Sequence, residues 1–85
     1  MIENNSEFFA AVKSLVEAWC DRKSLGALRR VLQAYPMTSG LTDEWGELAI
    51  AIENVRAFAR EEITERELRS LEDAIAYARK IVGRF

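Results

Sequence analysis

The sequence predicts an all-α protein, and most simply a compact four-helix bundle. Apolar residues recur every three or four positions along most of the 85 residues, which is the spacing of an amphipathic helix. No segment alternates apolar and polar residues with a period of two, so a sheet has little from which to form. Turn-forming residues concentrate in residues 36–42, around the single proline of the chain. An irregular orthogonal array of the same helices is the alternative arrangement.

A first helix is expected over about residues 6–20. An Asn or Ser between positions 4 and 6 can cap its N-terminus, and Glu7 suits the positive end of the helix dipole. Residues 21–23 are polar and are expected to form a short joint. The apolar face of this helix comprises Phe8, Ala11, Val12, Leu15, Val16 and Trp19.

A second helix is expected over about residues 24–35, because the apolar spacing restarts there in a new phase. Pro36 is expected to end this helix, since proline lacks an N–H group and pushes the preceding residue out of the helical region. The apolar face comprises Leu25, Leu28, Val31, Leu32 and Tyr35.

Two more helices are expected over about residues 43–62 and 64–82. The boundary between them carries a specific signal, because Thr64 and Glu67 have the spacing of a capping box. Trp45 lies on the apolar face of the third helix, and like Trp19 it is expected to be a core residue. At 85 residues the chain has room for a single helical domain, residues 1–85.

The composition argues against an enzyme and against a metal or cofactor site. The chain has no histidine, which is the commonest general acid–base group and metal ligand. Its one cysteine, Cys20, excludes a thiolate metal cluster and is expected to be a small buried thiol. The N-terminus lacks the basic start and apolar run of a signal peptide, and no segment is long enough to cross a membrane. We therefore expect a cytoplasmic protein.

Charge is distributed very unevenly along the chain. The net charge is -2, yet residues 22–42 carry +4 with no acidic residue, and residues 43–73 carry -6. Either these two segments face each other, within one molecule or across a dimer, or the basic residues form a solvated edge. The pattern favours a small helical protein–protein interaction module, most simply a homodimer.

Some polar and apolar residues are left over once the helices are packed, and they are the candidates for binding a partner. They include basic residues of the +4 segment, residues 22–42, and apolar residues outside the predicted core. Ile50 and Ala57 lie opposite the apolar face of their helix. The candidate partner-binding residues are Arg22, Lys23, Arg29, Arg30, Gln33, Ile50, Ala57, Phe9 and Met37.

Nucleic-acid binding is the alternative function. The first two helices would then form a helix-turn-helix, with four cations near the second helix. The sequence pI near 5.2 and a joint without glycine argue against it. The cations concerned are Arg22, Lys23, Arg29 and Arg30.

Overall fold

The computed structural model describes residues 2–35 and 42–83, and within them every regular element is helical. Four α-helices follow one another, and a short 3-10 helix, η1, precedes the last. The elements are α1 (Asn5–Arg22), α2 (Leu25–Val31), α3 (Thr42–Phe58), η1 (Arg60–Glu62) and α4 (Glu65–Val82). The prediction of an all-α protein is confirmed.

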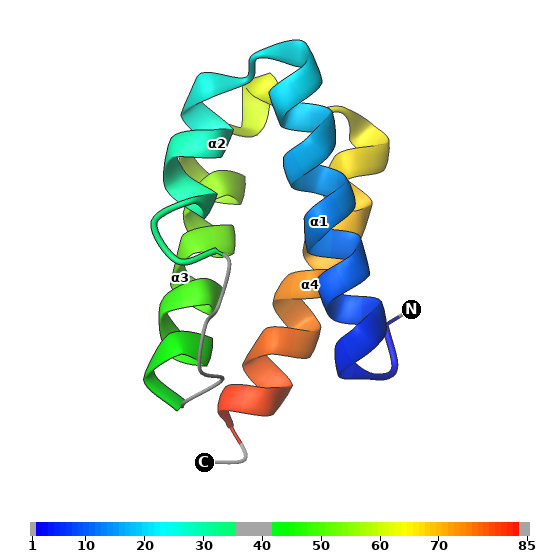
Figure 1. The fold of residues 1–85 in the computed structure, drawn as a ribbon, viewed down its shortest axis with the longest axis vertical. Coiled ribbons are helices and arrows are strands. Elements are labelled where there is room, and N and C mark those ends of the chain that lie inside the picture. The colour runs from blue at the N-terminus through cyan, green and yellow to red at the C-terminus, as the bar shows by residue number, and fades with distance from the viewer. Residues whose placement is uncertain (1, 36–41, 84–85) are drawn as a thin grey trace.

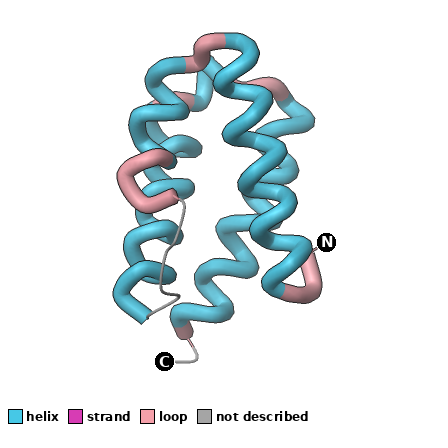
Figure 2. The backbone as a smooth tube through the Cα atoms, in the orientation of Figure 1, coloured by secondary structure: helices cyan, strands magenta, loops and turns pink. Residues whose placement is uncertain are grey.

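The four helices close into a ring around a shared core. Each one packs against its neighbour in the chain, and α1 also packs against α4. Figure 1 shows α1 and α4 on one side and α2 and α3 on the other, running roughly along the longest axis of the molecule. Figure 2 shows the short connections at the ends of the helices. With extents of 34 × 24 × 20 Å, this is the compact four-helix arrangement that the sequence predicts.

The core receives side chains from every helix, and both tryptophans belong to it, as predicted. Trp19 is fully buried and Trp45 is 5% exposed. The Phe8 ring lies 5.2 Å from the Trp45 ring and 5.4 Å from the Tyr77 ring, a cluster that joins α1, α3 and α4. Other large and fully buried side chains are Val12, Val31, Leu48, Ile52, Val55 and Leu71.

The first helix extends further than predicted, to Arg22, so the expected three-residue joint is wrong. Lys23 and Ser24 make the turn, and Lys23 has φ 57° and ψ 42° in the left-handed region. Its N–H donates to the carbonyl of Cys20 at 3.2 Å, and the N–H of Ser24 donates to that of Trp19 at 2.9 Å. These two bonds form a Schellman cap, which offsets the cost of a left-handed conformation at a residue other than glycine.

The second helix is shorter than predicted, because α2 ends at Val31 and not at residue 35. Residues 32–34 form a turn in which the N–H groups of Ala34 and Tyr35 both donate to the Val31 carbonyl at 3.1 Å. Proline restricts only the residue directly before it, here Tyr35, so the end of α2 at Val31 lies upstream of the residue on which Pro36 acts.

The third helix is interrupted where the sequence predicts continuity to residue 62. It ends at Phe58, and Ala59 leaves helical geometry with φ -126° and ψ 24° before η1 begins. The interruption turns the chain towards the start of α2. The boundary at the fourth helix is confirmed in detail, since Thr64 and Glu67 form the predicted capping box.

Candidate interaction surface

The start of α2 is capped by a side chain from elsewhere in the fold. Ser24 precedes α2 but makes no capping hydrogen bond with its side chain. Instead, Oε1 of Glu62 accepts the N–H of Gly26 at 2.9 Å and the N–H of Ala27 at 3.4 Å. A carboxylate here also meets the positive end of the helix dipole. Glu62 therefore holds the N-terminal end of α2 beside the C-terminal end of α3.

A second polar junction connects α1 to α4 through the carboxylate of Glu67. Its Oε1 accepts Nη2 of Arg22 at 2.8 Å, Nε1 of Trp19 at 3.2 Å and the N–H of Thr64 at 3.0 Å, and its Oε2 pairs with Nη1 of Arg22. Partial burial by itself raises the pKa of Glu67. The hydrogen bonds from Arg22, from the Thr64 backbone and from Trp19 outweigh that effect, so this pKa lies below its ordinary value.

These contacts change the role of Arg22 among the predicted partner-binding residues. Besides pairing with Glu67, its Nη2 donates to the backbone carbonyl of Glu62 at 2.9 Å. The exposed guanidinium is thus engaged by groups of its own chain, with Arg22 from the +4 segment paired to Glu67 from the -6 segment. We therefore leave Arg22 out of the contact surface proposed below.

Two other predicted candidates, Phe9 and Lys23, lie on α1 and directly after it. Phe9 is half-buried, with its ring 5.2 Å from that of Phe8 and 5.5 Å from that of Trp45, so it contributes to the core cluster. Lys23 is exposed at the turn between α1 and α2. Met37 lies outside the described residues.

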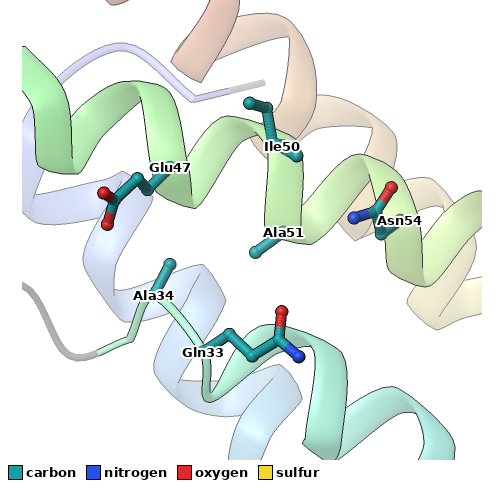
Figure 3. Close-up of a pocket in the computed structure, with 6 residues that line it drawn as sticks. All are labelled: Gln33, Ala34, Glu47, Ile50, Ala51 and Asn54. Carbon is teal, nitrogen blue, oxygen red and sulfur yellow. The ribbon is translucent and has the colours of Figure 1, made fainter.

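The remaining candidates lie on α2, in the turn after it, or on the neighbouring helix α3. Arg29 and Ala57 are exposed. Arg30 is half-buried, with its guanidinium carbon 5.5 Å from the centre of the Phe58 ring, within the range of a cation–π contact. Gln33 and Ile50 line a shallow hollow of about 230 Å³ between the two helices. Figure 3 shows Gln33 and Ala34 on one side of this hollow and residues of α3 on the other.

Exposed apolar side chains are concentrated on the same two helices. Among the described residues, the large hydrophobic side chains that are exposed are Leu25 (70%), Leu32 (50%), Ile50 (61%) and Phe58 (64%), and none lies on α1 or α4. The exposure of Ile50 confirms the prediction that its side chain lies opposite the buried face of its helix.

The prediction that Leu25 and Leu32 lie on the apolar, inward face of the second helix is wrong, because both are exposed, and Phe58 is exposed as well. A signal was nevertheless present, because Leu25 and Leu32 are seven residues apart and share a face that differs from that of the buried Ala27 and Val31.

We use the term α2/α3 surface for the outer sides of α2, the turn after it, and α3. Contacts between the two helices follow the antiparallel order. Gly26 lies beside Glu62 of η1 and Arg30 beside Phe58, and Gln33 lines the hollow together with α3 residues between positions 47 and 54. The surface comprises Leu25, Arg29, Arg30, Leu32, Gln33, Ile50, Asn54, Ala57 and Phe58.

The two helices that form this surface carry opposite charge. α2 contains Arg29 and Arg30 and no acidic residue. α3 contains four acidic residues against the single base Arg56. Asp43 and Glu47 are exposed, and Glu53 pairs with the exposed Arg79 of α4 at 2.5 Å. The α2/α3 surface therefore contains the cations Arg29 and Arg30, whereas the exposed acidic residues of α3 lie at the N-terminal end of that helix, outside the surface.

The described residues bring no set of metal ligands together. No group of three or more His, Cys, Asp or Glu side chains in residues 2–35 and 42–83 is placed to hold a metal ion. Cys20 is exposed, so the expectation of a buried thiol is wrong; it lies next to the buried Trp19 on a helix whose inward positions are spaced three or four apart. Among the helices described, none is both long and apolar enough to span a bilayer.

Comparisons with known proteins add no further information about this surface. No family model, no curated protein and no solved structure matches the chain. A function for this protein must therefore be argued from its own residues.

Proposed function

We propose that this protein is a small helical protein–protein interaction module that self-associates through the α2/α3 surface. The observation that carries the proposal is the asymmetry of exposure: four large apolar side chains are exposed on the α2 and α3 side, while no such side chain is exposed on the described parts of α1 and α4. An exposed apolar patch rimmed by polar groups is typical of an interaction site.

The residue types on this surface suit a protein partner. Aromatic residues and arginine are enriched at interfaces, and here the Arg30 guanidinium and the Phe58 ring already lie against each other. The hollow between the helices is smaller than the roughly 300–1,000 Å³ of common ligand pockets, and it is shallow. A flat contact with another protein fits this shape better than a small molecule does.

A second copy of the chain is the simplest partner, because two-fold homodimers are the commonest oligomers. The proposal places the protein in the cytoplasm, where the exposed thiol of Cys20 would stay reduced. It assigns no catalytic activity and no cofactor.

Nucleic-acid binding draws less support than self-association does. Of the four cations in that alternative, Arg22 is paired with Glu67 and Arg30 lies over Phe58, which leaves Lys23 and Arg29. α2 has seven residues, about two turns, and its partner helix α3 is acidic. The exposed acids Asp43 and Glu47 of α3 would repel phosphates.

Light scattering coupled to size-exclusion chromatography tests the proposal over a wide range of protein concentration. The mass of the wild type is expected to rise from one chain towards two, and Ile50→Asp is expected to keep it at one. The matched control is Ala76→Asp, which adds the same charge at an exposed position of α4. A wild type that stays monomeric at all concentrations, whatever the salt, would overturn self-association.

A further inference from the structure

Charge changes sign from one end of α3 to the other, and this gradient orients the second copy in the proposed dimer. The inference rests on the proposed function. At the C-terminal end, Arg30 of α2 lies over Phe58, and η1 follows with Arg60 exposed. At the N-terminal end, Asp43 and Glu47 are exposed, and residues 42–50 contain no basic residue.

The basic end stays basic when the acidic residues of η1 are counted. Arg29 is exposed at this end as well, which makes three arginines against Glu61 and Glu62. The carboxylate of Glu62 is also engaged, because it accepts backbone N–H groups at the start of α2. The long direction of α3 therefore runs from an acidic end to a basic end.

A two-fold axis in the plane of the surface either preserves or inverts position along α3. An axis along the helices preserves it, so the basic end meets the basic end of the second copy and the acidic end meets the acidic end. An axis across the helices inverts it, so each basic end meets an acidic end and the two α3 helices run antiparallel. Like charges brought together across an interface oppose association, so charge favours the axis across the helices.

The exposed apolar side chains of α3 give the level of this axis. Ile50 and Phe58 are the large hydrophobic side chains that are exposed on the described part of α3. Asn54 lies midway between them, four residues or about 6 Å from each. An axis at the level of Asn54 therefore brings Ile50 of each copy onto Phe58 of the other, and covers both.

The residues around Asn54 suit a contact between two helices. Ile50, Asn54 and Ala57 recur at spacings of four and three, so they share one side of α3, opposite the buried Ile52. Ala57 is small and allows the second helix to approach closely. On the axis, Asn54 meets its own copy, and its amide group can both donate and accept a hydrogen bond.

We propose that two copies of this chain pair through antiparallel α3 helices, related by a two-fold axis that crosses α3 at Asn54. Ile50 of each copy lies on Phe58 of the other, and the two Asn54 side chains face each other. Glu47 of each copy lies towards η1 of the other, where Arg60 is exposed.

Disulfide formation at the axis tests this arrangement. Asn54→Cys is made with Cys20→Ser, because the natural thiol is exposed. Residue 54 meets its own copy, so mild oxidation is expected to link most of the chains into covalent dimers. The matched control is Ala76→Cys with Cys20→Ser, at an exposed position of α4, and it is expected to stay largely unlinked. Linkage of Asn54→Cys no better than that of the control would overturn the proposal.

Exchange of charge between the two ends distinguishes the two axes. Glu47→Arg and Arg60→Glu each bring like charges together twice in the dimer, so each is expected to raise the dissociation constant about tenfold. The chain with both changes restores opposite charges and is expected to regain most of the wild-type affinity. With an axis along the helices, each residue would lie level with its own copy, so absence of this rescue would overturn the proposal.

Failure of this arrangement can be told apart from failure of the proposed function. A wild type that dimerises and an Ile50→Asp variant that does not would leave the proposed function in place, even if Asn54→Cys does not link. A wild type that stays monomeric would refute both.

Discussion

The carboxylate of Glu62 occupies the space that a β-carbon on Gly26 would fill, and its Oε1 accepts the Gly26 N–H at 2.9 Å. A glycine at this position lets the carboxylate approach the first turn of α2. The contact joins residues that are 36 positions apart in the chain. It fixes the position of α2 relative to α3. Arg29 and Arg30 of the α2/α3 surface are positioned with it.

Replacing Glu62 is expected to loosen this end of α2. Glu62→Ala removes the acceptor for the Gly26 and Ala27 N–H groups, and the loss of an N-terminal cap costs about 1 kcal/mol. Urea unfolding measures the change in free energy. The neighbouring Glu61→Ala, an exposed residue, is the control and is expected to cost less than half as much.

Gly26→Ala is expected to change stability little by itself, but it should abolish the effect of Glu62. The added β-carbon displaces the flexible carboxylate and removes the cap, while alanine gains about 1 kcal/mol of helix propensity over glycine. In a double-mutant cycle, Glu62→Ala should therefore cost almost nothing in the Gly26→Ala background. Additive free energies in this cycle would show that the two residues are not coupled.

Glu67→Ala is expected to destabilise the protein by about 2 kcal/mol, because it leaves Arg22 and Trp19 without their acceptor and removes half of the capping box. Thermal or urea unfolding measures the loss. The control is Glu65→Ala. Glu65 lies in the same first turn of α4 but is exposed, so its replacement is expected to cost no more than about 0.5 kcal/mol. Equal losses in the two variants would refute the structural role of Glu67.

The same carboxylate should make stability depend on acid pH. Because the pKa of Glu67 in the folded protein lies below its ordinary value of 4.5, its contribution is present above that value and is lost as the pH falls through the lower folded value. Urea unfolding between pH 7 and pH 3 measures this loss. Glu67→Gln does not titrate, so its stability should fall less over this range, and a parallel fall in both proteins would contradict the assignment.

Cys20 is expected to react with a thiol reagent in the native protein at a rate within about an order of magnitude of that in urea, because its side chain is exposed. A buried thiol would instead wait for the protein to open and would react a thousandfold or more slowly at ordinary stabilities of about 5 kcal/mol. A reagent that releases a coloured group on reaction lets absorbance follow the modification of the thiol. Cys20→Ser provides the blank.

The sequence alone accounts for the helical class, for the two core tryptophans and for the start of α4. Each depends on residues close together in the chain: the spacing of three and four that buries Trp19 and Trp45, and the local hydrogen bonds of the Thr64–Glu67 capping box. The exposed position of Ile50 followed from the same helical geometry.

Contacts between distant parts of the chain decided the features that local spacing could not predict. The break at Ala59 returns Glu62 to α2, and Arg22 is engaged by Glu67 rather than left for a partner. The choice of which apolar face of α2 enters the core also depends on its neighbours, and it left Leu25 and Leu32 exposed. Periodicity determines that a helix has an apolar side, whereas the helices packed around it determine how much of that side is covered.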